Sequence, residues 1–234
     1  MPGEMFPDPF LDVDEHRLVD AAGDALQFQL AGARVGVAGA GQGNTIMRAF
    51  DFVMTLYSFV YALGVAQILT TVGDMIRAGK RLRFSWLNAG WMLNVLLSIV
   101  ACWLSLWDLR GDESWPMVNV LVFFAVACLL YVLARMVSAP IAAEGIVDLQ
   151  RYHLQEGRKY AGLFALECAI TAGTVFLYGS TTQNWVATNW ATLPTMAASI
   201  AAASTNNRWV HSVALAVIML LWIWYFATLQ GALR

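Results

Sequence analysis

Charged side chains are scarce in this sequence. They make up 13% of its 234 residues, whereas 59% are hydrophobic and the mean hydropathy is +0.59. Average soluble domains carry about twice that charged fraction, so the composition excludes an ordinary soluble protein. The formal net charge of −2 is accompanied by no basic face that could neutralise nucleic-acid phosphates. We therefore expect a lipid bilayer, and no nucleic acid, to be the main partner of the surface.

Nucleophiles and metal ligands are sparse as well. Cys102, Cys128 and Cys168 lie in apolar runs without a CxxC pair or a flanking histidine, which argues against a disulfide framework or a zinc site. Only His211 lies within an apolar run, so a haem held by two intramembrane histidines is not expected. The chain contains no P-loop, HExxH motif or nucleophile elbow. The sequence therefore predicts no catalytic residue, no metal and no cofactor.

Long apolar runs, by contrast, are abundant. A helix needs about 20 residues to cross a hydrocarbon core about 30 Å thick. The runs predict an all-α polytopic transmembrane helix bundle with short loops over residues 50–230, with spans near 52–74, 84–107, 116–138, 160–178, 185–203 and 209–229. The fifth span is the weakest, because it is rich in Ala and Thr and contains Asn189 and Pro194. If it does not cross, five spans remain and the C-terminus lies on the opposite side.

Lys and Arg are distributed unevenly among the predicted loops. Loops 75–83 and 139–159 are basic and the last loop holds Arg208, whereas Arg110 of the second loop stands among acidic residues. Positive residues mark the cytoplasmic side. We therefore expect these basic loops to be cytoplasmic and both termini to lie outside. The predicted location is the cell (plasma or inner) membrane, and the excess of Arg over Lys indicates a bacterial source.

Residues 1–49 differ from the rest of the chain, being acidic at first and then rich in Gly and Ala. They lack the basic and apolar regions of a signal peptide. Two interpretations stay open. The segment is a polar external tail with a short amphipathic helix near residues 13–30, or translation starts at Met47, directly before the first span.

Polar side chains fall on one face of each of the first two predicted spans, because they recur every three or four residues. These faces consist of Tyr57, Tyr61, Gln67 and Thr71 on the first span and of Asn88, Asn94 and Ser98 on the second. A polar group that faces lipid has no hydrogen-bond partner, so we expect both faces to point into the bundle. Ordinary helix packing explains them, and a hydrated path is the alternative.

Glu167 is the most informative single residue, since it lies within the fourth span at a depth of about 10 Å. A charged carboxylate at that depth is costly unless it is paired. Arg135 is expected at a comparable depth on the preceding span, with His211 and Asp74 in the same half of the membrane. We predict a Glu167–Arg135 ion pair in a cytoplasmic-side polar cluster with His211 and Asp74. This cluster fixes helix packing or, alternatively, relays a proton or an ion.

The third loop carries His153 and several carboxylates, including Glu156 one helical turn later. It is long enough for an amphipathic helix beside the membrane, and a divalent-ion site is conceivable there. A charged connector in contact with water is the simpler expectation.

The lack of catalytic and metal-binding motifs favours a non-enzymatic accessory or structural membrane component. We expect it to work with another membrane protein or as a homo-oligomer. The alternative is a small transporter or channel that uses the polar cluster around Glu167. An intramembrane enzyme ranks third, because no converging set of catalytic groups can be assembled.

Overall fold

The structure is a computed structural model that describes residues 49–107, 116–141, 145–177 and 182–232. This part contains seven α-helices and one pair of two-residue strands. The elements are α2 (Ala49–Ala78), the short 3-10 helix η1 (Gly79–Arg81), β1 (Leu82–Arg83), α3 (Trp86–Trp107), α4 (Met117–Val137), β2 (Val147–Asp148), α5 (Leu149–Leu177), α6 (Thr182–Thr188), α7 (Thr192–Ser204) and α8 (Arg208–Ala232). The tail expected before the first span, the alternative start at Met47 and the charges of the second loop around Arg110 lie outside the described residues.

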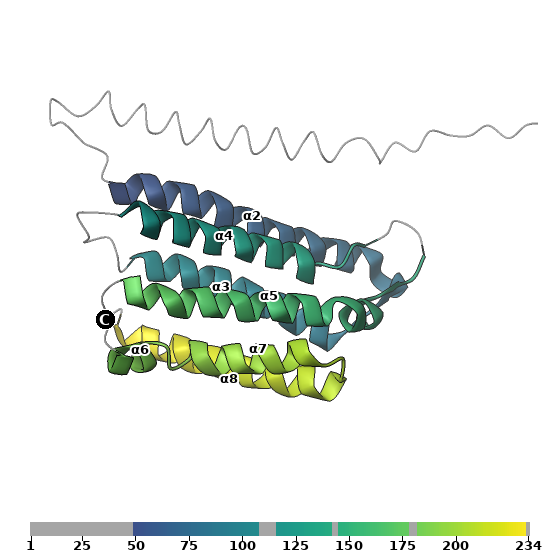
Figure 1. Ribbon diagram of the computed structural model, residues 1–234. Helices are drawn as coiled ribbons and strands as arrows, with labels where there is room; N and C mark the ends of the chain where they lie inside the picture. Colours follow the sequence, from purple (N-terminus) through teal and green to yellow (C-terminus); the bar gives the residue numbers. More distant parts are fainter. Residues whose placement is uncertain (1–48, 108–115, 142–144, 178–181, 233–234) are drawn as a thin grey trace, which may run out of the picture. The chain divides into compact units, whose positions relative to one another are not determined.

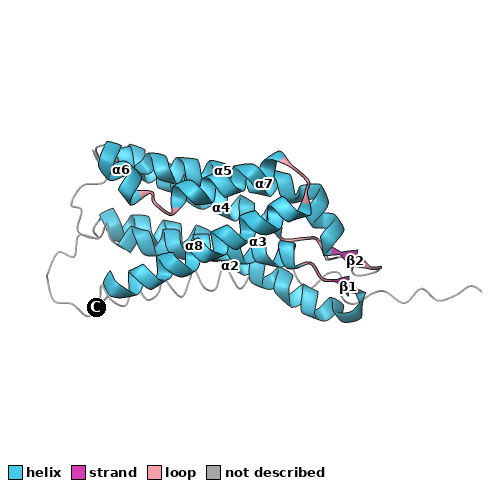
Figure 2. Cartoon of the chain, turned by 90° about the horizontal axis from the view of Figure 1, so that it is seen from below, coloured by secondary structure: helices cyan, strands magenta, loops and turns pink. Residues whose placement is uncertain are grey.

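The long helices lie side by side along one direction, as Figures 1 and 2 show from two sides. Helix α3 is central, because it packs against α2, α4, α5 and α8. Helix α5 lies between α4 and α7, and α7 packs on α8. Residues distant in sequence on α3, α5, α7 and α8 are thereby brought together.

Four helices are long and apolar enough to cross a membrane, judged by length and composition. They are Phe52–Arg81, Trp86–Leu106, Met117–Val137 and Arg208–Thr228. The expectation of an all-helical chain with helices of membrane length is therefore confirmed for these four helices. The count of six spans stays a prediction. Helix α7 has 13 residues and is therefore about 20 Å long, too short to cross alone.

The predicted fifth span is broken between α6 and α7. Backbone N–H groups of Asn189 and Leu193 still donate to the carbonyls four residues earlier, each at 3.0 Å. Pro194 has no N–H group, and its ring crowds the carbonyl of the residue four positions before it. That residue, Trp190, lies in the turn that separates the two helices. The proline that weakened the prediction thus accounts for the break.

The connections that follow α2, α4 and α7 meet at one end of the bundle. Strand β1 pairs in parallel with β2 (Figure 2), and the Arg83 guanidinium lies 3.6 Å from the Asp148 carboxylate. The Arg158 Nε atom donates to the backbone oxygen of Ala203, near the end of α7, at 2.9 Å. We call this the basic end, defined by Arg77, Lys80, Arg81, Arg83, Arg151, Arg158, Lys159 and Arg208.

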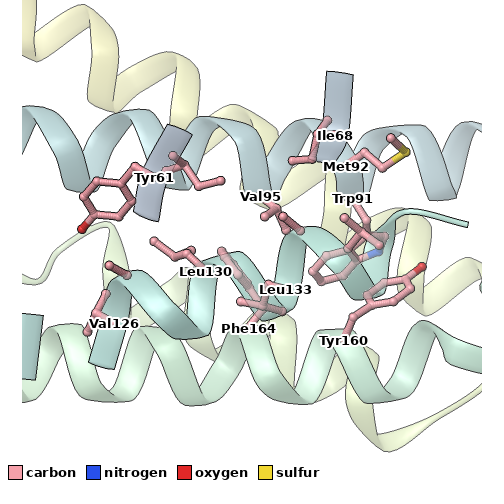
Figure 3. Close-up of a cluster of buried hydrophobic side chains, with 14 of the residues drawn as sticks. Tyr61, Ile68, Trp91, Met92, Val95, Val126, Leu130, Leu133, Tyr160 and Phe164 are labelled. Atoms are coloured by element: carbon pink, nitrogen blue, oxygen red, sulfur yellow. The ribbon is translucent and has the colours of Figure 1, made fainter. Parts of the chain in front are cut away.

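The core next to the basic end is aromatic (Figure 3). The Trp91 side chain of α3 is 0% exposed. Its ring centroid lies 5.5 Å from that of Tyr160 and 6.0 Å from that of Phe164, both on α5. Further along the bundle Gly64 lets α2 approach α3 closely, since a Cβ there would lie 2.9 Å from Ile99 Cδ1. Helices α2, α3 and α5 are therefore closely packed.

Candidate functional site: a cavity around a buried carboxyl group

A cavity of about 140 Å³ lies among α3, α5, α7 and α8. Its polar lining comes from one carboxyl group and several hydroxyl groups, on Ser98, Ser105, Glu167, Thr171, Thr192 and Thr195. The rings of Phe164, Trp222 and Tyr225 and the thiols of Cys102 and Cys168 also line it. Among the described residues that line the cavity, none is Lys, Arg or His.

Glu167 carries the only carboxyl group among the described residues of this lining, and the residue is 4% exposed. Its Oε1 atom accepts a hydrogen bond of 2.9 Å from Thr171 Oγ1, one helical turn further along α5. The Cys102 thiol of α3 donates to the same oxygen at 3.9 Å. The carboxyl group is thus held by neutral donors inside the bundle.

The predicted Glu167–Arg135 ion pair is not formed, and this prediction was wrong. Arg135 donates instead from Nη1 to the side-chain oxygen of Gln67 on α2, at 2.7 Å. The reason is the rotation of the two helices about their axes. Arg135 lies on the side of α4 that faces α2, whereas Glu167 lies on the side of α5 that faces the cavity.

The rest of the predicted cluster is also separated. Asp74 lies 3.6 Å from Arg77 in the last turns of α2, where both side chains are well exposed. His211 packs near Trp91, with ring centroids 6.5 Å apart. The four residues of the predicted cluster therefore belong to four different local environments.

The two polar helix faces point into the bundle, where their side chains bond to α4, to α8 or within their own helix. Of their members, Tyr57, Tyr61, Thr71, Asn88, Asn94 and Ser98 are buried and Gln67 is half-buried. The Tyr57 hydroxyl donates to the backbone oxygen of Val120 on α4 at 2.6 Å. The Asn94 side-chain oxygen accepts from Trp222 Nε1 on α8 at 2.8 Å. Asn94 thereby fixes one wall of the cavity.

A pair of histidines near the basic end was missed by the sequence analysis. His153 of α5 is 2% exposed, and its ring centroid lies 4.8 Å from that of His211 of α8, edge to face. His153 Nδ1 hydrogen-bonds to the Tyr160 hydroxyl, and His211 Nε2 donates to the backbone oxygen of Thr205 at 3.0 Å. The expectation of a water-exposed connector was therefore wrong for His153. The one available signal was the spacing of seven from His153 to Tyr160, which places both on one helix face.

Gly157 makes room for this pair. A Cβ at that position would lie 3.2 Å from His153 Cε1 and 3.3 Å from His211 Cε1. Burial, and then the neighbouring His211, lower the pKa of His153 to about 4. The His153 imidazole is therefore neutral near pH 7, and it packs edge to face against the His211 ring. In the part of the chain that the structure describes, no group of three or more His, Cys, Asp or Glu side chains could hold a metal ion.

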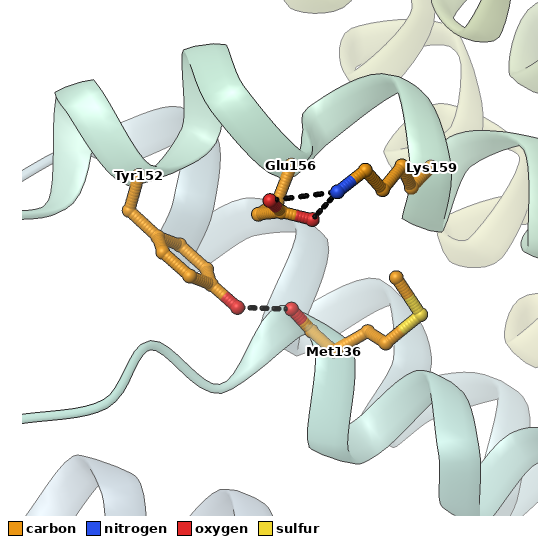
Figure 4. A network of polar contacts seen from close by, with 4 residues as sticks. All are labelled: Met136, Tyr152, Glu156 and Lys159. Carbon is orange, nitrogen blue, oxygen red and sulfur yellow. Dashed lines mark hydrogen bonds and ion pairs between the residues drawn. The ribbon is translucent and has the colours of Figure 1, made fainter.

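The end of α4 is capped by side chains from two other helices. The last carbonyls of a helix have no partner within it. The Tyr152 hydroxyl donates to the Met136 carbonyl at 2.6 Å (Figure 4), and Asn88 Nδ2 donates to the Val137 carbonyl at 3.0 Å. On the same helix as Tyr152, Lys159 and Glu156 form an ion pair at 2.8 Å. The Tyr152 bond fixes the start of α5 against α4.

Replacing Tyr152 with Phe is expected to lower the free energy of unfolding by about 1 kcal/mol, the usual net contribution of one hydrogen bond. The loss arises because the Met136 carbonyl then has no donor from α5. Thermal unfolding of the purified protein in detergent measures it. Tyr131→Phe on α4 is the matched control, and an equal loss in both variants would contradict the capping role.

Comparison with protein-family models, with curated proteins and with solved structures finds no match.

Proposed function

We propose that this protein is a small multi-pass membrane transporter in which Glu167 is the binding group. The observation that carries the proposal is a carboxyl group that is 4% exposed, lines a cavity and has no cationic neighbour among the described residues of that lining. Two of the four helices of membrane length, α3 and α8, line that cavity together with α5 and α7. An intramembrane carboxyl group of this kind is expensive to retain without a function.

The chemistry of Glu167 follows from its surroundings. An ionised carboxylate inside the bundle is costly without a positive partner. Glu167 therefore favours one of two states. Either its carboxyl group holds a proton, or a cationic solute occupies the cavity beside the carboxylate. The two states exclude each other, and this competition is the simplest way to couple a solute to protons.

The proposed topology is that of six crossings, with α6 and α7 as one broken helix. Discontinuous helices are tolerated at membrane depth where they line a cavity, and Thr192 and Thr195 of α7 line this one. We place the basic end in the cytoplasm of a bacterial cell, because positive residues are retained on that side. The cell membrane as location belongs to the same proposal.

The test is proton flux in proteoliposomes loaded in turn with Na⁺, K⁺ and tetramethylammonium, because a coupled transporter moves protons only while its solute moves. A pH-sensitive dye inside the vesicles follows the flux. We expect Glu167→Gln to lower the protein-dependent flux by about tenfold or more, since an amide cannot take up the proton. Glu156→Gln, at the surface of the basic end, is the control and should retain the flux. Equal flux in wild type and Glu167→Gln would overturn the proposal.

An accessory role is the second candidate, favoured by a groove of about 420 Å³ between α2 and α3. Small residues of α2, Ala62 and Ala66, line it together with Val65, Leu69, Ile99 and Trp103. Small residues allow close approach of another transmembrane helix. Stoichiometric copurification of a second membrane subunit in mild detergent would favour this role over transport.

A further inference from the structure

We propose that the cavity around Glu167 takes a small organic ammonium ion as its solute. This inference rests on the proposed function, because it names the class of substrate for the same site. The first observation is charge. Glu167 supplies one buried carboxyl group, and the described lining supplies no cation to pair with it. A ligand that brings one positive charge completes the site.

The second observation is that three aromatic rings, those of Phe164, Trp222 and Tyr225, also line the cavity. The Trp222 indole is held in place by its hydrogen bond of 2.8 Å to the side-chain oxygen of Asn94. Its centroid lies 5.7 Å from that of Tyr225, edge to face. Aromatic faces attract ammonium groups, most strongly where water is excluded. A carboxylate and fixed aromatic rings that line the same cavity are the groups that recognise an organic cation.

An inorganic cation fits this lining less well. Hard metal ions take about six to eight oxygen ligands and usually several carboxylates, whereas this cavity has one carboxylate.

The size of the cavity limits the ligand. Its volume is about 140 Å³, and an engineered apolar cavity of about 150 Å³ in another protein binds benzene. The solute is therefore a compact ammonium ion with few carbon atoms. Tetramethylammonium is a suitable probe, because its charge is permanent and the lipid bilayer alone does not let it pass.

The experiment measures binding of tetramethylammonium to the full-length protein in lipid nanodiscs by calorimetry, with empty nanodiscs as blank. We expect saturable binding that Glu167→Gln weakens by about tenfold or more, since the Coulomb attraction between the carboxylate and the ammonium charge is lost. Trp222→Leu is expected to weaken it by about fivefold, and Trp222→Phe to restore most of the affinity because an aromatic face returns. Trp224→Leu is the control, because Trp224 is 64% exposed and lies outside the cavity lining. Thermal unfolding identifies any variant that fails to fold.

Failure of this inference is distinguishable from failure of the proposed function. Proton flux that depends on Glu167, together with no binding of tetramethylammonium, would overturn the ammonium site and leave transport standing. Binding that Glu167→Gln does not change would also overturn it. Binding that depends on Glu167 and Trp222 without any flux would support the site and overturn the transport function.

Discussion

Trp91→Ala is expected to lower the free energy of unfolding by about 3 kcal/mol, at the lower end of the range for removing a buried tryptophan. The indole is 0% exposed and contacts Tyr160, Phe164 and His211 of two other helices. Its removal leaves a cavity that these side chains fill only in part. The lower end of the range applies because lipid provides no hydrophobic driving force between helices, so the lost packing dominates.

Chemical unfolding in detergent micelles, followed by circular dichroism, measures this loss. Trp86→Ala is the matched control, because the Trp86 side chain is 82% exposed and its removal leaves no cavity. Trp91→Phe should recover more than half of the lost stability, since it keeps a ring and removes an indole N–H that is buried without a partner. A loss no greater in Trp91→Ala than in Trp86→Ala would contradict the central role of Trp91 in the core.

Acid is expected to destabilise the protein through the histidine pair. The pKa of His153 is lowered from 6.5 to about 4 in the folded state, by burial and then by His211. Between these two values the unfolded chain binds a proton that the folded protein does not bind. Stability is therefore complete above pH 6.5 and is lost as the pH falls toward 4. A shift of this size corresponds to at most about 3 kcal/mol, and residual hydration reduces it.

We expect the melting temperature in detergent to be roughly 5 °C lower at pH 4.5 than at pH 7.5, from about 2 kcal/mol of destabilisation. His153→Gln keeps a polar side chain that cannot take up the proton, so this variant should lose most of the difference. Comparison of the two proteins is needed, because the lowered pKa of Asp148, held down first by the backbone N–H of Arg151, also contributes acid sensitivity. An unchanged pH dependence in His153→Gln would contradict the assignment.

The candidate site combines Glu167, which the sequence predicted, with aromatic residues of α8 that the sequence did not predict. Glu167 was identified from its position inside an apolar run, because a carboxyl group there is energetically costly wherever the helix lies. Its surroundings were predicted wrongly. Depth along the membrane placed Arg135 near Glu167, but rotation of the helices placed them on different sides. Trp222 and Tyr225 of α8 carried no signal, because aromatic residues are common near the ends of apolar helices.

The sequence by itself determined the properties that depend on position along the chain. The scarcity of charge, the long apolar runs, the interruption at Pro194 and the uneven distribution of Lys and Arg each have a local physical cause. Only the tertiary structure decided which helix faces meet. One residue turns a helix by about 100°, so the partner of a buried group depends on helix rotation and on neighbours distant in the chain. Contacts between α5 and α8 bury His153 against His211, and contacts among four helices enclose Glu167.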